Sequence, residues 1–183
     1  MAGSALYRLP QAAWLLSFAP EVLKVLRQHA QVGRLSRESV GQLYARDLTA
    51  STVVVAKATC LKATYARWAR VRFDVHEAMR ERGRLFEEGW HCVGFWHTHP
   101  EPTPKPSPED RAMARDHARA ALSVTNGMIF AIVGTVPLPA GLVVWFDDGV
   151  SLDAMEPMSA APDSAVAMSN TAAPHELRAK ADT

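Results

Sequence analysis

The sequence predicts a layered domain of the α/β or α+β class, in which helices pack on a set of strands. Two observations support this class. Hydrophobic residues make up 48% of the 183 residues, enough for one full core. The expected elements also follow the order strand, helix, several strands, helix, strand, helix and strands, which is typical of layered domains.

The N-terminal half contains short apolar runs separated by polar turns. Residues 1–11 show no regular pattern and are expected to be irregular. Four runs have the composition of β-strands: residues 13–18, 39–45, 51–61 and 67–73. Pro20 is expected to open a helix directly after the first run, because proline is favoured at the first helical position.

The following residues predict two more helices and three strands. Asp74 precedes a helical pattern as an N-cap, with Glu77 three residues later, and Gly89 ends the pattern. The remaining elements are a strand over 91–97, a helix over 107–120 and strands over 128–134 and 141–146.

The composition changes near residue 150. Residues 1–150 are expected to form the domain, whereas residues 151–183 are rich in Ala, Ser and Pro and lack a sustained period. We predict that this tail is either disordered or a partner-binding segment.

Charge and cysteine content narrow the function classes. The net charge of +1 provides no broad field for nucleic acid or an anionic membrane, and no segment is long enough to span a membrane. Arg8 and residues 12–19 weakly resemble a signal peptide, but the apolar stretch is short and a helical pattern follows at once, so we expect a first strand there instead. Cys60 and Cys92 are expected to be buried free thiols, which favours the cytoplasm.

One motif, formed by two histidines, a serine and an aspartate, indicates a metal site. His97 and His99 end the apolar strand, and alternate residues of a strand point to one face, so both imidazoles can reach one ion. Ser107 and Pro108 predict a helix start that brings Asp110 to the same place. Two nitrogens and a carboxylate are the ligands of a catalytic zinc site with an open fourth position. The ordinary interpretations are a polar pair at a strand end and a simple helix cap.

The spacing H-x-H-x7-S-x2-D, with Thr98 and Pro100 beside the second histidine, resembles the JAMM motif of the JAB/MPN-plus zinc metalloproteases. The segment of residues 38–43 also matches the upstream E-x-x-G-x-L context of that family, with Glu38 as the acid. The resemblance covers about residues 12–148. It implies a curved mixed β-sheet flanked by helices, the cytidine-deaminase-like JAB/MPN fold.

The resemblance also implies roles for the motif residues. One Zn2+ per chain would be held by His97, His99 and Asp110. Glu38 would be the general base, and Ser107 would stabilise the oxyanion as well as cap its helix. His91 and His117 are expected to be structural or surface histidines, and Thr98 is expected to point away from the ligand face.

The implied activity is isopeptide or peptide cleavage after the C-terminus of ubiquitin or a ubiquitin-like protein. The short 134–141 connection leaves no room for a long insertion, which resembles compact bacterial members, including those of antiviral conjugation operons. Expected partners are ubiquitin-like proteins or their conjugates, and E1-like and E2-like proteins of the same operon. No nucleic acid or membrane partner is expected.

Three alternatives stay open at this level. The first is a peptidase that trims a sulfur-carrier protein with the same chemistry. The second is a metal-free, non-catalytic MPN scaffold within a complex, which the intact ligand set disfavours. The third is a RadC-like role in DNA repair, for which a nearly neutral chain offers little support.

Overall fold

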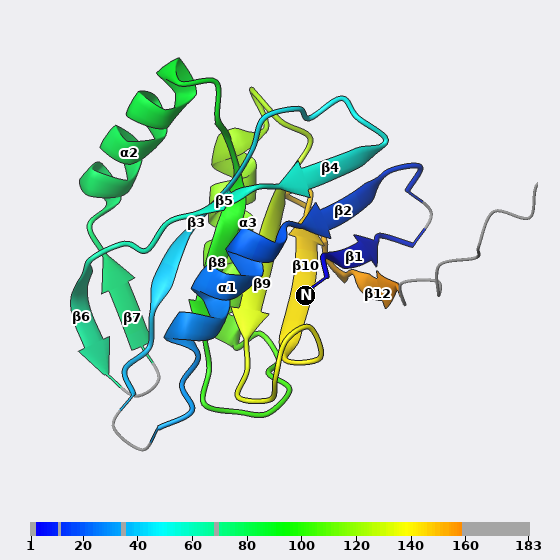
Figure 1. The fold of residues 1–183 in the computed structure, drawn as a ribbon. Coiled ribbons are helices and arrows are strands. Elements are labelled where there is room, and N and C mark those ends of the chain that lie inside the picture. Colours follow the sequence, from blue (N-terminus) through cyan, green and yellow to red (C-terminus); the bar gives the residue numbers. More distant parts are fainter. Residues whose placement is uncertain (1–2, 11, 34–35, 68–69, 159–183) are drawn as a thin grey trace, which may run out of the picture.

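The computed structural model describes residues 3–158 except 11, 34–35 and 68–69, and gives only the backbone of residues 63–67 and 70–73. A mixed six-stranded sheet forms its centre (Figure 1). The strands lie in the order β11 (Leu152–Ala154), β10 (Leu142–Asp147), β9 (Met128–Val133), β8 (His91–Thr98), β3 (Val40–Ala45) and β5 (Lys57–Ala58). Only β8 and β9 pair in parallel within this sheet. The predicted mixed α+β class is confirmed.

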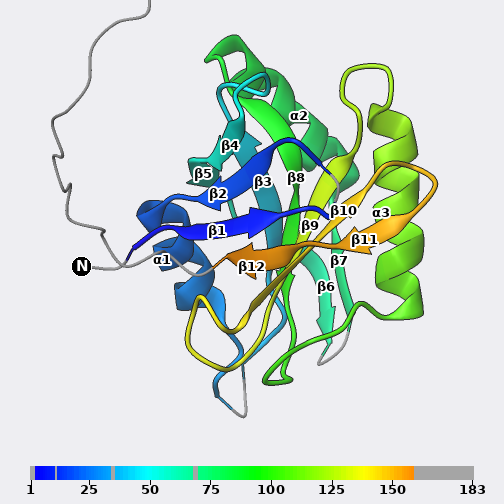
Figure 2. The ribbon, with the colours of Figure 1, turned by 90° about the vertical axis from the view of Figure 1, so that its right-hand side faces the viewer.

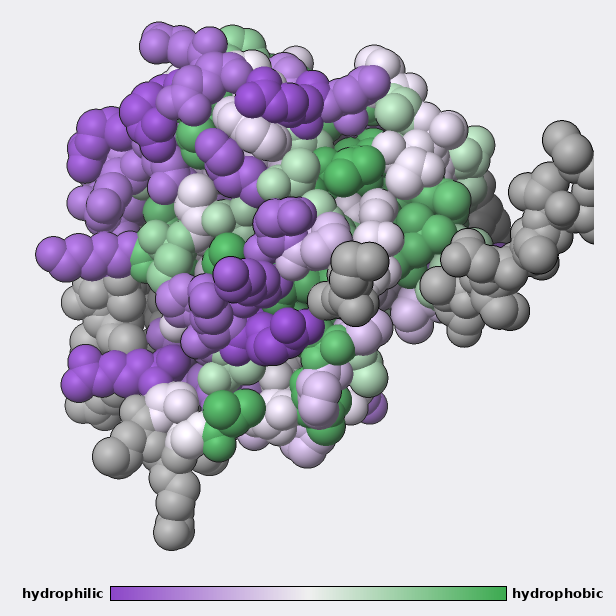
Figure 3. Space-filling view, viewed as in Figure 1, coloured by the Kyte–Doolittle hydropathy of each residue, from purple (hydrophilic) through white to green (hydrophobic). Residues whose placement is uncertain are grey.

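A second, four-stranded sheet covers part of one face. Its order is β12 (Glu156–Met158), β1 (Ala5–Arg8), β2 (Leu15–Phe18) and β4 (Thr52–Val55), with β2 and β4 parallel. A separate hairpin joins β6 (Ala63–Arg67) to β7 (Arg70–Phe73). In the view of Figure 3, hydrophobic side chains gather on the side that carries β2 and β4, and hydrophilic ones cover the side that carries α2.

In the described part of the chain, three helices complete the layers: α1 (Pro20–His29), α2 (Val75–Glu87) and α3 (Pro108–Ala121). Figure 2 shows α1 and α3 on opposite sides of the central sheet. Two of the predicted helix starts are confirmed in detail. Asp74 accepts hydrogen bonds from the backbone N–H groups of His76 and Glu77, and Pro20 occupies the first turn of α1. Among the described residues, no helix is long and apolar enough to cross a membrane.

The main core lies between α1, the four-stranded sheet and one face of the central sheet. Leu26 from α1, Phe18 from β2 and Trp96 from β8 are all fully buried in it. Gly41 lies opposite Trp96 on β3, where an added Cβ would come within 1.8 Å of the Thr59 carbonyl oxygen. This glycine therefore permits the close approach of β3 to residue 59.

The α3 face of the central sheet has a smaller core. Phe95 of β8 packs there with Ala114 and Ala118 of α3. The pairing of β3 with β8 shifts between Leu43 and Tyr44, which leaves Val93 without a partner on β3. Because of this bulge, Val93 and Trp96 can both face the main core while Phe95 faces α3.

Two sequence predictions are wrong at the ends of the chain. Residues 5–8, expected to be irregular, form β1, and residues 152–158, assigned to the tail, form β11 and β12. β12 pairs antiparallel with β1, and β11 with β10. The folded domain thus extends at least to Met158, and the rest of the predicted tail, residues 159–183, lies outside the described residues.

Candidate metal centre

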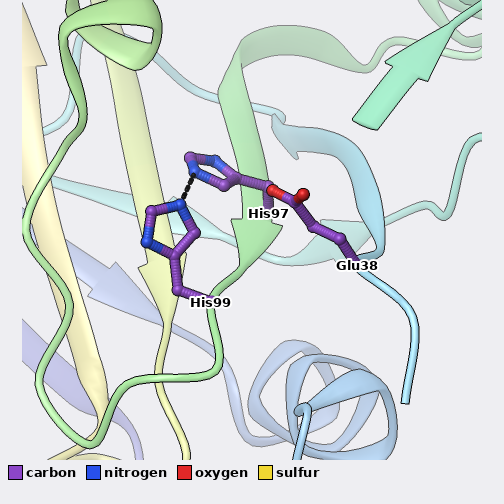
Figure 4. Close-up of side chains that lie close together, drawn as sticks. All are labelled: Glu38, His97 and His99. Atoms are coloured by element: carbon purple, nitrogen blue, oxygen red, sulfur yellow. Dashed lines mark hydrogen bonds between the residues drawn. The ribbon is translucent and has the colours of Figure 1, made fainter. Parts of the chain in front are cut away.

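The two histidines of the motif lie at the carboxyl end of β8. Phe95, His97 and His99 alternate along this segment, so the imidazoles follow Phe95 onto the α3 face of the sheet. The rings point toward one another, with 3.1 Å between their Nε2 atoms (Figure 4). Thr98 points the other way, as predicted, and its Oγ1 accepts a hydrogen bond from the Ser39 N–H at 2.9 Å.

The start of α3 brings Asp110 to the same point. Ser107 is the N-cap and Pro108 follows it, as the sequence predicts. The cap is reciprocal: the Asp110 N–H donates to Ser107 Oγ at 3.1 Å, and the Ser107 N–H donates to Asp110 Oδ2 at 2.8 Å. The Asp110 carboxylate then lies 3.2 Å from His97 Nε2 through Oδ1 and 3.5 Å from His99 Nε2 through Oδ2.

These separations fit a tetrahedral metal. Ligand atoms about 2.0–2.1 Å from a zinc ion lie about 3.3 Å from one another in a tetrahedron. The N–N separation of 3.1 Å and the two N–O separations of 3.2 and 3.5 Å, one to each oxygen of Asp110, fall close to that value. A cation among His97, His99 and Asp110 would satisfy both nitrogens and the carboxylate at once.

The surroundings of Asp110 favour its ionised form, which is the form that binds a metal. Burial alone would raise the pKa of Asp110, but hydrogen bonds from the side chains of His97, His99 and Ser107 hold it well below its usual range. For His99, burial acts to lower the pKa, yet the carboxylates of Asp110, Glu101 and Glu38 together raise it. The negative charges concentrated around the imidazoles would equally stabilise a metal cation.

Glu38 reaches the centre from the segment before β3. Val40 lies opposite His97 in the antiparallel β3–β8 pair, so the register continued by two residues places Glu38 opposite His99 on the same face. The Glu38 side chain is 8% exposed, and its carboxylate lies within 4.8 Å of the two imidazole nitrogens. Figure 4 shows it pointing toward the histidines.

The Glu38 carboxylate differs from that of Asp110. Its buried Oε2 has no hydrogen-bond partner among the described residues. Burial raises the pKa of Glu38 to about 7, partly opposed by His99 and reinforced by Asp110 and Glu101. A carboxyl group that titrates near neutral pH can both accept and release a proton. Glu38, His97 and His99 also have one ligand atom each within 4.8 Å of one another, so this second set could hold an ion too.

Comparison with known families agrees with this geometry. A family described as prokaryotic homologs of the JAB domain matches residues 19–146. The chain belongs to this family. The matched region runs from the start of α1 to β10 and contains every residue of the candidate centre, so the resemblance seen in the sequence is confirmed. No curated protein matches the chain.

A solved structure has a fold similar to that of this chain. The solution structure of protein DSY2949 from Desulfitobacterium hafniense has a TM-score of 0.55 and 18% identity, covering 75% of this chain and 87% of that one. A protein from Salinibacter ruber, also 18% identical, has a TM-score of 0.46 over 80% of this chain and 92% of its own. At this identity the first comparison supports the fold alone.

The JAB domain also contains a contact that sequence reasoning did not name. His99 Nδ1 lies 3.1 Å from Glu101 Oε2, so a carboxylate meets the ring nitrogen that faces away from His97. A carboxylate in this position orients a ligating imidazole and selects its tautomer. The only sequence signal was an acid two residues after the second histidine.

Other candidates lie elsewhere in the fold. His91 packs against Phe86 with ring centroids 5.5 Å apart, and His117 lies against Phe95 at 4.5 Å. Neither belongs to the group of possible metal-binding side chains found among the described residues. Both cysteines are free, but Cys60 is exposed and Cys92 only partly buried, so the expected burial is wrong for Cys60.

Proposed function

We propose that this JAB domain is a zinc-dependent peptidase or isopeptidase that cleaves after the C-terminus of a ubiquitin-like protein. The proposal depends mainly on one observation. The two imidazole nitrogens of His97 and His99 and the two carboxylate oxygens of Asp110 converge at separations close to those around a tetrahedral ion, and a buried, unpaired oxygen of Glu38 lies beside them. A non-catalytic scaffold has no need for either feature.

Zinc is the metal that fits this donor set best, since two imidazoles and one carboxylate leave an open position in catalytic zinc sites. A bound zinc would polarise the scissile carbonyl and bring the pKa of a water ligand to about 7. One ion per chain would satisfy the three side chains. Glu101 would orient the His99 ring toward it.

Glu38 would act as the general base. In hydrolysis, water adds to the carbonyl carbon, the C–N bond breaks, and one proton must move from the water to the departing amine. Burial raises the pKa of Glu38 in the metal-free protein to about 7, so this carboxylate accepts a proton more readily than an exposed one and could pass it on. The unpaired Oε2 of Glu38 leaves one oxygen available for this transfer.

Ser107 would stabilise the developing oxyanion. Its Oγ accepts a hydrogen bond from the Asp110 N–H, and this uses a lone pair rather than the hydroxyl proton. The hydroxyl proton lies within reach of the Asp110 carboxylate, and it would turn to an oxygen that gains negative charge beside the metal. The same residue holds the first turn of α3, so its position is fixed before the substrate binds.

A flexible C-terminal tail is the substrate form that suits such a centre. The scissile carbonyl must come within about 3 Å of the base and the metal, which an interior bond of a folded protein cannot do. Membership of the JAB family supports a ubiquitin-like tail that ends in glycine, with a lysine side chain or a short extension as the leaving group. Conjugates made by E1-like and E2-like proteins of the same operon, including an antiviral one, would be the natural substrates.

The direct test incubates zinc-loaded protein with a ubiquitin-like protein joined to lysine or to a short extension, and follows product by mass spectrometry. We expect cleavage after the terminal glycine and much slower cleavage when the last two residues of the tail are bulky. Equal cleavage of the bulky variant or of casein would indicate a general peptidase. Zinc binding without cleavage of any substrate would favour the scaffold alternative.

A further inference from the structure

Gln31 links the segment that carries Glu38 to the strand that carries the histidines. This residue follows the end of α1, and its side chain is buried, with 5% of its surface exposed. When its amide is turned so that the oxygen faces the Glu38 N–H, that oxygen lies 3.1 Å from the Glu38 nitrogen, and the amide nitrogen lies 3.0 Å from the Thr98 carbonyl oxygen. In the opposite orientation the nitrogen makes only a 3.4 Å bond to the Ser36 carbonyl and faces the Glu38 N–H, which is also a donor. The oxygen must face the N–H, because an NH2 group could not accept that bond.

The two backbone groups that Gln31 contacts belong to residues at the candidate metal centre. Thr98 lies between the two histidine ligands, and Glu38 is the proposed base. Two further hydrogen bonds join the same segments, from the Thr98 N–H to the Ser39 carbonyl at 3.0 Å and from the Ser39 N–H to Thr98 Oγ1 at 2.9 Å. Those bonds hold Ser39, whereas Gln31 holds the N–H of Glu38 itself.

The contact of Gln31 with the Glu38 backbone, here called the tether, matters because no hydrogen bond fixes the end of the Glu38 side chain. Its buried Oε2 has no partner among the described residues. The direction of the carboxylate therefore depends on the backbone from which it extends. A general base has to stay within hydrogen-bond reach of the proton it takes, and a displacement of about 1 Å can cost about a hundredfold in rate.

We propose that Gln31 is a positioning residue that holds Glu38 against the ligand strand through its side-chain amide. This role rests on the proposed function, since it concerns the base of the proposed reaction. Gln31 would touch neither the substrate nor the metal. It would act only through the backbone of Glu38 and Thr98.

The test replaces Gln31 by leucine, which has a similar size but makes no hydrogen bond, with Gln31→Met as a second variant in case leucine does not fold. Gln28→Leu, on an exposed position of α1, is the matched control. We expect Gln31→Leu to keep one zinc per chain and an almost unchanged KM while kcat falls about tenfold to a hundredfold. In a Glu38→Gln background the same substitution should lower the residual rate no further.

Hydrogen exchange of the Glu38 N–H, followed by NMR, tests the tether without any activity. We expect exchange at least about tenfold faster in Gln31→Leu than in wild type or Gln28→Leu, because the N–H loses its acceptor. Unchanged exchange would overturn the tether. Faster exchange with unchanged kcat, or an equal loss of rate in the Glu38→Gln background, would overturn the positioning role. A wild-type protein that cleaves nothing would refute the proposed function, whereas the exchange result would still decide whether the tether exists.

Discussion

Replacing Glu38 by glutamine should separate catalysis from stability. The substitution keeps the size and buried position of the side chain but removes its charge and its ability to carry a proton. We expect the variant to fold, to bind one zinc and to lose hydrolysis by about a hundredfold or more, the usual contribution of a general base.

The effect on the metal-free protein can be worked from the structure. Burial raises the pKa of Glu38 from its ordinary value of 4.5 to about 7. The folded state therefore binds more protons than the unfolded state between these pH values, and stability falls as the pH rises through this window. The difference of about 2.5 pH units corresponds to about 3 kcal/mol, fully expressed above pH 7 and absent below pH 4.5.

Urea denaturation of the metal-free proteins at pH 4 and pH 8 measures this difference. Glu38→Gln should be more stable than wild type by up to about 3 kcal/mol at pH 8 and nearly equal at pH 4. Glu87→Gln, an exposed glutamate at the end of α2, is the control and should show no such pH dependence. The stabilised protein should be the inactive one, because a base kept buried for catalysis is costly to the fold.

Two outcomes would refute this reasoning. If the free energies of unfolding of Glu38→Gln and wild type differ equally at both pH values, the carboxyl group is not held in the buried state that raises its pKa. If zinc-loaded Glu38→Gln cleaves substrate at nearly the wild-type rate, another group moves the proton.

Two further predictions concern Ser107 and the end of the domain. Ser107→Ala should keep zinc but lower kcat about tenfold to a hundredfold. Loss of the N-cap should also lower the free energy of unfolding by about 1 kcal/mol. An unchanged kcat would mean that Ser107 only caps the helix. Truncation after Met158 should give a folded protein that binds zinc, whereas truncation after Val150 removes β11 and β12 and should lower the melting temperature markedly, as circular dichroism would show. Equal melting temperatures for the two truncations would mean that these strands contribute nothing to the fold.

The approach of His97, His99 and Asp110 to one another was predicted partly from local patterns. The alternation of a strand fixes His97 and His99 on one face, and the cap at Ser107 fixes the start of α3 and so the place of Asp110. The loop of residues 100–107 could span about 25 Å when extended, so its length alone does not bring strand end and helix start together, and the motif spacing shared with the JAB family was needed to predict it. Glu38 could be placed only through the family resemblance, because its approach depends on the pairing of β3 with β8.

The missed elements depend on distant pairing. β1 and β12 have only four and three residues, too few for a period to stand out, and β12 contains Pro157. Each becomes a strand because Leu6 lies opposite Met158, far along the chain. The exposure of Cys60 was also missed. Its apolar neighbours in the sequence predict a strand, but they do not determine which side chains of that segment face the solvent.

Zinc content tests the central claim most directly, because His97, His99 and Asp110 form one candidate ligand set and Glu38 with the two histidines forms another. The measurement is zinc per chain, by elemental analysis after dialysis, in wild type, Asp110→Asn and Glu38→Gln. We predict one zinc in wild type and in Glu38→Gln, and loss of most zinc in Asp110→Asn. Full zinc in Asp110→Asn with loss in Glu38→Gln would contradict the assignment and make Glu38 a ligand rather than the base.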